Sequence, residues 1–394
     1  MLSPGATTTV LHVTQPVTEG VGNYVGEVVA AQVALGFRVG LACPDDSELA
    51  RSARQAGAEV LPWAASRQPG PSVLSEIRRL RRALARFKPD LVHLHSSKAG
   101  MAGRLAIHGT LPTVFQPHAW SFEAASLLRP VARRWERVAG SWADAIVTVS
   151  EEEQAQARAA GITPVGFAAT VPNPIDLDRF HSAVELASGT DDRSGPVRRS
   201  LGLGGKPMVL CVGRLCRQKG QDLLVDSWPR VAEAVPGAQL VLVGDGPDAA
   251  RLAKRRTADI HLLGVRRDVP ALLAEADVVA MPSRWEGMSL AMLEALAAGK
   301  PVVISDVGGA AETVGQGAGA IVDIGDTTQL SWEISRRLLD RRLREEEGQR
   351  GREIVRANHH SLEATVTALQ QVYERVLARR GRRRHGLASH GAGR

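Results

Sequence analysis

The chain has 394 residues, 44% of them hydrophobic, and is long enough to bury two separate cores, so two domains are expected. No apolar run approaches the ~18 residues of a membrane span, and the polar start lacks a basic leader followed by an apolar block, which predicts a cytoplasmic protein. The three cysteines, Cys43, Cys211 and Cys216, suggest neither a disulfide framework nor a metal-ligand spacing.

The net charge of +7 comes mainly from arginine, which is concentrated in residues 78–88, 129–137 and 375–394. An anionic partner is therefore expected. Nucleic acid is disfavoured, because the sequence has no zinc spacing, basic-zipper heptads or aromatic RNA-binding signature. The inner face of the cytoplasmic membrane is a better candidate, since residues 77–87 mix cationic and apolar positions at helical spacing. A solvated helix whose arginine stems cover its apolar side is the alternative.

Short apolar runs alternate with helical patterns along the chain, which is typical of parallel β-α-β units. In the first half, strands are predicted at residues 9–13, 38–42, 91–94, 113–115 and 145–149, and a helix over about 23–35. In the second half, strands are predicted at residues 208–212, 239–243, 277–281 and 301–304. The expected fold class is α/β, with two Rossmann-like, doubly wound domains facing each other across a cleft.

The domain boundaries follow from composition. An N-terminal domain is expected over residues 1–175, a polar and glycine-containing linker over 176–196 and a C-terminal domain over 197–357. A final helix, residues 358–377, has one apolar face behind Ser361 and is expected to pack back on the first domain. The basic tail, residues 378–394, is expected to be disordered.

Two carboxylates bracket the start of a helix predicted within residues 281–299. Glu286 and Glu294 lie eight residues apart, which on a helix places them on roughly one face. The backbone N–H groups of Met288, Ser289 and Leu290 lie between them and would bind an anion, because the helix dipole favours negative charge there. An amphipathic helix with a surface glutamate at each end is the alternative.

A basic loop bounded by glycines follows the strand at 208–212. It reads Gly213-Arg214-Leu215-Cys216-Arg217-Gln218-Lys219-Gly220. Ligands of open α/β sheets bind at the carboxyl ends of strands. Arg214 and Lys219 are suited to neutralise a leaving nucleoside diphosphate, and no metal is then needed.

Three other motifs could indicate a dinucleotide or metal site, but each has an argument against it. Residues 244–249 read Gly-x-Gly-x-x-Ala, like a dinucleotide fingerprint, but they follow the second strand of their domain rather than the first. His93 and His95 share one face of a strand like metal ligands, but the sequence offers no evident third ligand. Asp176 and Asp178 mimic a metal motif but fall in the predicted linker, which favours a structural role.

The basic loop at 213–220, followed by Glu286 and Glu294, resembles the family-four retaining glycosyltransferases of the GT-B fold (glycosyl transferases group 1, E-x7-E type) in both order and spacing. Supporting matches are the glycine-rich stretch 19–24, His118 in Pro-His-Ala-Trp, and residues 173–176 and 244–247. The resemblance covers nearly the whole chain.

The resemblance implies roles for individual residues. The catalytic set would be Arg214, Lys219, Glu286 and His118. Donor-binding residues would be Gly22, Gly213, Val265, Arg266, Gly287, Met288, Ser289, Leu290 and Glu294. Arg214 and Lys219 would hold the diphosphate, Glu286 the sugar and Glu294 the ribose. Acceptor-binding candidates are Gly20, Asn23, Ser96, Lys98 and Trp120. Lys98 is suited to an acceptor phosphate, and a structural role at the end of the strand is the alternative.

The expected reaction is transfer of a hexosyl or N-acetylhexosaminyl group from a nucleotide diphosphate sugar, a UDP-sugar being favoured, to a hydroxyl acceptor. The resemblance implies retention of configuration by same-face attack; for a covalent route, Glu286 is the candidate. No cofactor or metal is expected. The expected acceptor is a lipid-linked saccharide of envelope or exopolysaccharide synthesis, with a small secondary-metabolite aglycone as the alternative. A phosphorylase or sugar-phosphate glycosyltransferase and a catalytically inactive nucleotide-sugar-binding subunit also remain open, as does the oligomeric state.

Overall fold

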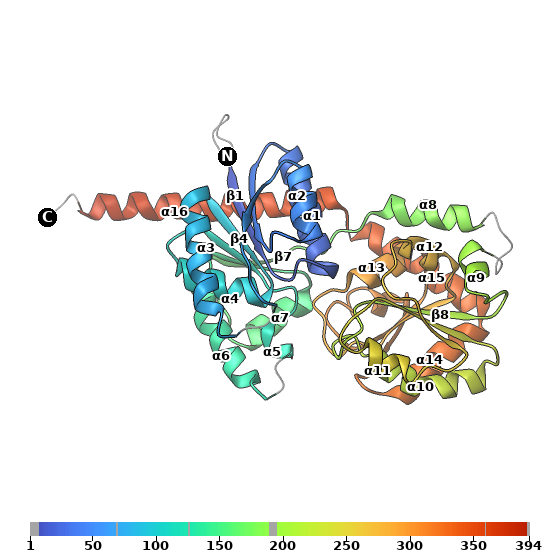
Figure 1. Ribbon diagram of the computed structural model, residues 1–394. Coiled ribbons are helices and arrows are strands. Elements are labelled where there is room, and N and C mark those ends of the chain that lie inside the picture. Colours follow the sequence, from blue (N-terminus) through green and yellow to red (C-terminus); the bar gives the residue numbers. More distant parts are fainter. Residues whose placement is uncertain (1–7, 68–69, 125–126, 189–194, 359, 392–394) are drawn as a thin grey trace. The chain divides into compact units, whose positions relative to one another are not determined.

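The computed structural model describes residues 8–391 apart from 68–69, 125–126, 189–194 and 359 (Figure 1). The chain divides into two compact units. Unit 1 comprises Met1–Pro174 together with Leu362–Arg394, and unit 2 comprises Ile175–Ser361. Each unit is built on one sheet of parallel strands with helices on both faces.

The sheet of unit 1 has seven strands in the order β3-β2-β1-β4-β5-β6-β7. They are β1 (Thr9–Thr14), β2 (Arg38–Cys43), β3 (Glu59–Pro62), β4 (Leu91–His95), β5 (Thr113–Gln116), β6 (Ala145–Thr148) and β7 (Phe167–Thr170). β2 and β3 are added on one side of β1, and β4 to β7 are added on its other side. The crevice outside the carboxyl ends of β1 and β4 is therefore the position where such sheets bind ligands.

Helices cover both faces of this sheet. One face carries α1 (Glu19–Ala34), α2 (Glu48–Gln55) and α16 (Leu362–Gly391), and its core includes Val28 and Tyr373. The other face carries α3 (Val73–Phe87), α4 (Ser96–Ile107), α5 (Ser121–Ala124), α6 (Arg129–Gly140) and α7 (Glu151–Ala159). The end of the chain thus completes the core of the first unit.

The sheet of unit 2 has six strands in the order β10-β9-β8-β11-β12-β13. They are β8 (Met208–Val212), β9 (Gln239–Val243), β10 (Ile260–Leu262), β11 (Val278–Met281), β12 (Val302–Ser305) and β13 (Gly319–Val322). The helices are α8 (Leu177–Ser188), α9 (Pro196–Ser200), α10 (Gln221–Ala234), α11 (Ala249–Ala253), α12 (Val269–Glu275), α13 (Leu290–Ala297), α14 (Thr327–Leu339) and α15 (Arg341–Ala357), with a 3-10 turn at Val314–Gln316. The direction of winding reverses between β8 and β11.

The α/β class and the two doubly wound sheets predicted from the sequence are confirmed. Two segments differ from expectation. Part of the predicted linker forms α8, which packs against α12. The helix forms there because Asp176 caps its first turn by accepting a hydrogen bond from the backbone N–H of Arg179. Phe180 on this helix is buried. The final helix continues to Gly391 rather than ending at 377, and Arg380 anchors it by pairing with Asp144 at 2.7 Å. Residues 189–194 of the predicted linker and 392–394 of the predicted tail lie outside the described residues.

The basic helix expected at a membrane, α3, buries its apolar side in the core of unit 1 through Ile77, Leu80 and Phe87. Arg78 and Arg82 lie on its exposed side. The structure therefore favours a solvated helix over one that inserts apolar side chains into a bilayer. Among the described helices, none has the length and apolar character needed to cross a membrane.

Candidate active site

The winding of the second sheet brings two of the predicted catalytic side chains together. Lys219 follows β8 and Glu286 follows β11, and these strands are neighbours at the point where the winding reverses. Lys219 Nζ lies 2.6 Å from Glu286 Oε1. The candidate site therefore lies at the carboxyl edge of this sheet, where open α/β sheets bind ligands.

The carboxylate of Glu286 is buried, with its side chain 8% exposed, and is held by three donors. Besides Lys219, it accepts hydrogen bonds from Ser283 Oγ at 2.9 Å and Gln218 Nε2 at 3.4 Å. Burial alone would lower the pKa of Lys219, but the neighbouring Glu286 carboxylate outweighs burial and raises it above its ordinary value. Lys219 therefore stays protonated at neutral pH, with its charge paired to the Glu286 carboxylate.

Glycines allow the loops at this edge to pack backbone against backbone. A Cβ on Gly244 would lie 2.1 Å from the carbonyl oxygen of Gly213, and a Cβ on Gly308 would lie 2.4 Å from that of Glu286. Gly308 lies three residues after β12 and was not singled out in the sequence, although a Gly-Gly pair so close to the end of a strand indicates a close backbone approach. These contacts fix the loops that follow β8, β9, β11 and β12 relative to one another.

The start of α13 forms the second half of the site. Met288 and Ser289 are buried, Ser289 is the N-cap, and the helix runs from Leu290 through the partly exposed Glu294. Ser289 Oγ has no hydrogen-bond partner among the described residues, although it is buried. An unsatisfied hydroxyl at the positive end of a helix is suited to an anionic oxygen. Gly287 lies between this helix start and Glu286.

The remaining predicted donor residues belong to neighbouring loops of the same unit. Arg214 is partly exposed in the loop after β8, and its carbonyl accepts a hydrogen bond from Gln221 at 3.0 Å. Val265 is 75% exposed in the loop after β10. Arg266 pairs with Asp268, with Nε 2.7 Å from Oδ1. The guanidinium of Arg266 is thus anchored ahead of α12.

Strained backbone marks the carboxyl edge of the first sheet. Glu19, Ser96 and His118 have φ values of +62°, +71° and +54°, and Ala119 has +110°. They follow β1, β4 and β5, which are neighbours in the sheet. Positive φ is uncommon for residues other than glycine, and such strain clusters at functional sites. The structure thus places His118 at the edge where a ligand of unit 1 is expected.

The predicted residues of unit 1 have mixed surroundings. Gly22 permits a tight turn into α1, because a Cβ there would lie 2.5 Å from the carbonyl carbon of Val17. Ser96 is buried and donates a hydrogen bond to the Gln15 carbonyl, and Trp120 is 1% exposed in the core. These three contribute to the fold. Gly20 and Asn23, in contrast, are exposed at the start of α1.

Lys98 occupies a different environment from the predicted one. Its Nζ lies 2.6 Å from Glu76 Oε2, and the two side chains are 3% and 0% exposed. Burial would raise the pKa of Glu76, but hydrogen bonds from Lys98, Ser72 and Ser66 hold it below its usual value. This buried pair gives Lys98 a structural role in place of the predicted contact with an acceptor phosphate.

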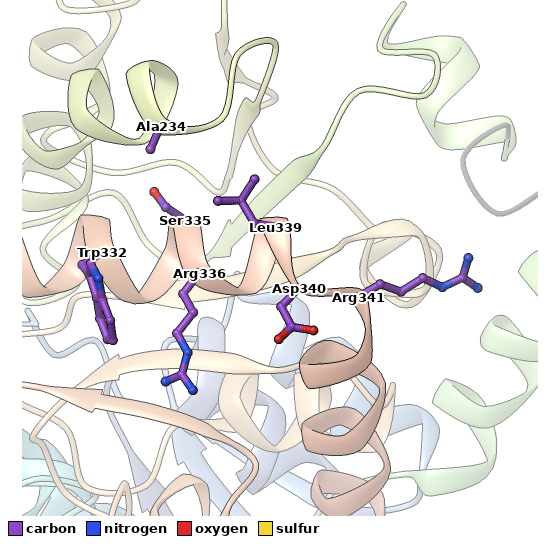
Figure 2. Close-up of a pocket in the computed structure, with 7 residues that line it drawn as sticks. All are labelled: Ala234, Trp332, Ser335, Arg336, Leu339, Asp340 and Arg341. Atoms are coloured by element: carbon purple, nitrogen blue, oxygen red, sulfur yellow. The ribbon is translucent and has the colours of Figure 1, made fainter.

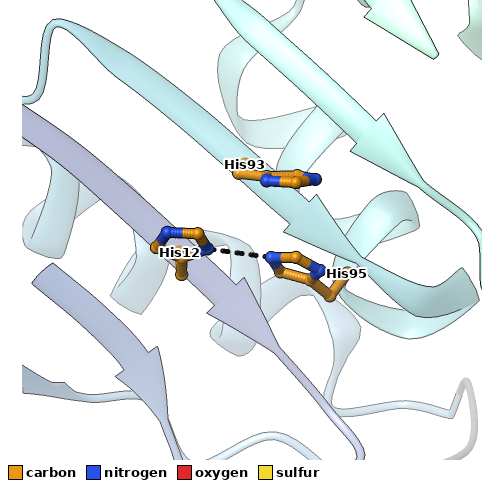
Figure 3. A group of neighbouring side chains, drawn as sticks. All are labelled: His12, His93 and His95. Atoms are coloured by element: carbon orange, nitrogen blue, oxygen red, sulfur yellow. Dashed lines mark hydrogen bonds between the residues drawn. The ribbon is translucent and has the colours of Figure 1, made fainter. Parts of the chain in front are cut away.

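The third histidine that was not evident in the sequence is His12. It lies beside His93 in the parallel register of β1 and β4, and ring nitrogens of His12, His93 and His95 lie within 4.8 Å of one another (Figure 3). However, His12 Nδ1 lies 2.9 Å from His95 Nε2, and the two ring planes are 16° apart. Two ring nitrogens that face each other at this distance suit an N–H···N hydrogen bond better than the ligation of a tetrahedral ion. We interpret the group as a hydrogen-bonded cluster.

These histidines predict a loss of stability in mild acid. Burial lowers the pKa of His12 from 6.5 to about 4, so the unfolded chain binds a proton there before the folded chain does. Stability is therefore complete above pH ~6.5 and falls as the pH decreases toward ~4, by about 3 kcal/mol from His12 alone. Burial also lowers the pKa of His93 and His95 well below 6.5, which acts in the same direction. Urea unfolding at pH 7.5, 6 and 5 measures the loss.

The variant His12→Gln is expected to flatten this pH dependence. His181→Gln is the control, because the His181 side chain is 50% exposed. Equal pH slopes for the native chain and His12→Gln would contradict the prediction.

A surface hollow elsewhere on unit 2 is distinct from this site. It has a volume of about 640 Å³ and lies where α14 meets α15, beside the end of α10. Figure 2 shows the side chains that line it: Ala234, Trp332, Ser335, Arg336, Leu339, Asp340 and Arg341. It includes none of the predicted site residues.

Two family models match the chain. One, described as "Glycosyl transferases group 1", matches residues 206–340, and the other, "Glycosyl transferase 4-like domain", matches residues 19–174. The chain is 33% identical over 307 residues to a GDP-mannose-dependent alpha-(1-6)-phosphatidylinositol monomannoside mannosyltransferase of Mycobacterium tuberculosis, which covers 73% of this chain and 76% of that protein. It is 30% identical over 243 residues to an Escherichia coli UDP-Gal:alpha-D-GlcNAc-diphosphoundecaprenol alpha-1,3-galactosyltransferase, covering 58% of this chain and 61% of that protein.

Solved structures with the same fold match most of the chain. A sucrose-phosphate synthase from Thermosynechococcus elongatus has a TM-score of 0.77 at 22% identity, covering 94% of this chain and 99% of that chain. Anabaena Alr3699/HepE in complex with UDP and glucose has a TM-score of 0.77 at 20% identity, covering 93% and 99%.

Proposed function

This chain belongs to the family-four glycosyltransferases of the GT-B fold, and we propose that it transfers a mannosyl group from GDP-mannose to a hydroxyl of a lipid-linked acceptor, with retention of configuration. One observation carries the donor site. The Lys219–Glu286 pair lies at the reversal of the second sheet, and Glu286 shares its loop with the start of α13, where the buried Ser289 hydroxyl has no partner among the described residues.

The proposed catalysis is mainly electrostatic. Negative charge builds on the departing diphosphate as the bond to the sugar breaks. Lys219, Arg214 and the start of α13 would oppose this charge, and such preorganised groups are often the largest contribution to catalysis. Two cations and a helix start suffice for the diphosphate, so the proposal requires no metal ion.

Retention is proposed to occur by attack on the same face of the sugar. A covalent route needs a carboxylate free to attack, whereas Glu286 already accepts hydrogen bonds from Ser283, Gln218 and Lys219. This favours a role for Glu286 in holding sugar hydroxyls. The leaving phosphate oxygen would then accept the proton of the attacking hydroxyl, and Glu294 would hold the ribose.

The relatives support the choice of donor. The sequence alone favoured a UDP-sugar, but the mycobacterial relative that matches 73% of this chain is described as GDP-mannose-dependent. The Escherichia coli relative is described as using UDP-Gal and matches a smaller share of this chain. GDP-mannose is therefore the first donor to test, and UDP-sugars are the second.

An exposed patch on unit 1 supports a lipid-linked acceptor. Leu127, Leu128 and Val131 at the start of α6 are 94%, 66% and 63% exposed, and the exposed Arg133 and Arg134 follow on the same helix. Apolar side chains beside arginines suit the surface of an anionic membrane. We therefore propose peripheral contact with the inner face of the cytoplasmic membrane, testable by sedimentation with anionic and with zwitterionic vesicles. Equal sedimentation with both would contradict it.

Protection against thermal unfolding tests the donor site. GDP-mannose at ~100 times its dissociation constant is expected to stabilise the chain by about 2.7 kcal/mol. UDP-glucose and UDP-galactose are the comparison ligands. A shift with a UDP-sugar alone would replace the proposed donor, and no shift with any nucleotide sugar would contradict the donor site.

A further inference from the structure

A continuous chain of hydrogen bonds joins a glutamine of α1 to His118. Gln32 Oε1 lies 2.8 Å from His12 Nε2, His12 Nδ1 lies 2.9 Å from His95 Nε2, and His95 Nδ1 lies 3.2 Å from His118 Nε2. Gln32, His12 and His95 are at most 1% exposed, whereas His118 is partly exposed at the carboxyl edge of the first sheet. The chain therefore runs from the core of unit 1 to its ligand-binding edge.

The three rings are joined edge to edge. The ring centroids of His12 and His95 are 5.2 Å apart with planes 16° apart, and those of His95 and His118 are 5.5 Å apart with planes 30° apart (Figure 3 shows the first pair). In both pairs one ring nitrogen faces another at hydrogen-bond distance. Both ring nitrogens of His12 and both ring nitrogens of His95 therefore take part in these hydrogen bonds.

Burial leaves each ring with one proton. It lowers the pKa of His12 to about 4 and that of His118 to about 3, and that of His95 well below 6.5. At neutral pH all three imidazoles are therefore neutral, so each has one nitrogen that donates and one that accepts. The direction of one hydrogen bond then fixes the direction of all the others.

Gln32 determines that direction. Its amide oxygen can only accept, so His12 must donate from Nε2, His95 must donate from Nε2 to His12, and His118 must donate from Nε2 to His95. Nδ1 of His118 is then left without a proton. Rotation of the amide by half a turn would reverse every bond and leave a proton on that nitrogen.

Tyr373 contacts the other half of the Gln32 amide. Gln32 Nε2 donates to the Tyr373 hydroxyl at 3.3 Å, and that hydroxyl lies 2.7 Å from His93 Nδ1. In this arrangement the hydroxyl accepts from the amide and donates to His93, whereas a reversed amide would require a proton on His93 Nδ1. Tyr373 lies on α16, so this helix couples the amide of Gln32 on α1 to the tautomer of His93.

We propose that Gln32 is a positioning residue: its side-chain amide, acting through the two rings between them, fixes the tautomer of His118 and holds Nδ1 of His118 as a hydrogen-bond acceptor for a hydroxyl group of a saccharide. The identity of the ligand rests on the proposed function. The tautomer itself does not, because it is a property of unit 1 without a ligand.

The first test is a measurement of the tautomer. Nitrogen-15 NMR of histidine-labelled protein distinguishes the protonated ring nitrogen, and comparison with His118→Gln identifies the signals of His118. The native chain is expected to show His118 protonated at Nε2, and Gln32→Leu is expected to show a mixture of both forms. A native His118 protonated at Nδ1, or a tautomer unchanged in Gln32→Leu, would overturn the proposal.

A matched control exists in unit 2. Gln239 is 5% exposed, and its Oε1 lies 2.8 Å from His261 Nε2. It therefore makes the same kind of glutamine–histidine hydrogen bond, but it takes no part in the hydrogen bonds that lead to His118. Gln239→Leu is expected to change the signals of His261 and leave His118 unchanged. If it alters His118 as Gln32→Leu does, the effect is a general loss of packing and the proposal fails.

Turnover separates this proposal from the proposed function. Gln32→Leu is expected to lower kcat/KM for GDP-mannose about tenfold, the effect of losing one hydrogen bond in the reacting complex. A changed tautomer together with native turnover would overturn the part that concerns the saccharide. A native chain that turns over no nucleotide sugar would refute the proposed function while the NMR result for Gln32 stands.

Tyr373→Phe serves where Gln32→Leu does not fold. Removing this hydroxyl uncouples the amide from His93, so both orientations of the amide and both tautomers of His118 are expected, and a single unchanged tautomer would contradict the proposal. Metal analysis of the purified protein is the last test of the proposal. One equivalent of zinc that is lost in His93→Gln would show a metal centre in place of the hydrogen-bonded chain and overturn it.

Discussion

Replacing Lys219 with alanine is expected to lower kcat/KM for the nucleotide sugar by a factor of about 10²–10³, the usual loss when one preorganised charge is removed from an active site. The side chain lies at the reversal of the second sheet, and its charge is held by Glu286 at 2.6 Å. Because charge on the diphosphate develops as the bond breaks, the larger effect is expected on kcat. Steady-state kinetics with the native chain and the variant provide the measurement.

Stability must be measured alongside, because Lys219→Ala leaves Glu286 buried without its cation. Ser283 and Gln218 still donate to that carboxylate, so a loss of about 1–3 kcal/mol is expected. Lys206→Ala is the matched control, since Lys206 is exposed just before β8, away from the carboxyl edge. Parallel losses of activity and folding in Lys219→Ala would favour a purely structural pair.

The donor site was predictable because its parts are local in the sequence. Lys219 and Glu286 each lie in a short motif directly after an apolar strand, and the two strands are neighbours at the reversal of the sheet. Their pairing then follows from topology. The Gly308-Gly309 pair indicates a close backbone approach, but its partner, the Glu286 carbonyl, was not predictable, because it depends on how two distant loops meet.

Nine strands were expected, and the four that were missed are the edges of the two sheets: β3, β7, β10 and β13. Interior strands of a parallel sheet are covered on both faces and read as continuous apolar runs. β9, for example, is buried at every position, whereas β7 has no buried residue. The apolar signal that identifies a strand is therefore weakest at the edges.

The contacts between buried polar side chains of unit 1 could not be predicted from the sequence. His12 and His95 are 83 positions apart, and only the register of β1 and β4 brings them together. Gln32 and Tyr373 meet across 341 positions because the last helix packs on the first unit. Lys98 resembled a surface cation at a strand end, since nothing in the sequence showed that Glu76 turns inward from an arginine-rich helix.

Replacing Lys98 with methionine is expected to destabilise unit 1 by about 3–5 kcal/mol, the cost of leaving a buried partner charge uncompensated. Glu76 is fully buried. In the variant its carboxylate still accepts hydrogen bonds from serine hydroxyl and backbone N–H groups, among them Ser72 Oγ at 2.8 Å, but it has lost its cation. Urea unfolding at pH 7.5 measures the loss. Lys88→Met, at an exposed position that ends α3, is the control and is expected to change stability by less than about 0.5 kcal/mol.

A second substitution identifies the origin of the loss. Glu76→Gln combined with Lys98→Met removes both charges, so the double variant is expected to be more stable than Lys98→Met alone, since no unpaired charge remains buried. The same variants decide between the two roles considered for Lys98. If Lys98 held an acceptor phosphate, Lys98→Met would raise the KM for the acceptor at native stability, and Glu76→Gln would not restore it. A stability loss that Glu76→Gln relieves assigns Lys98 to the core.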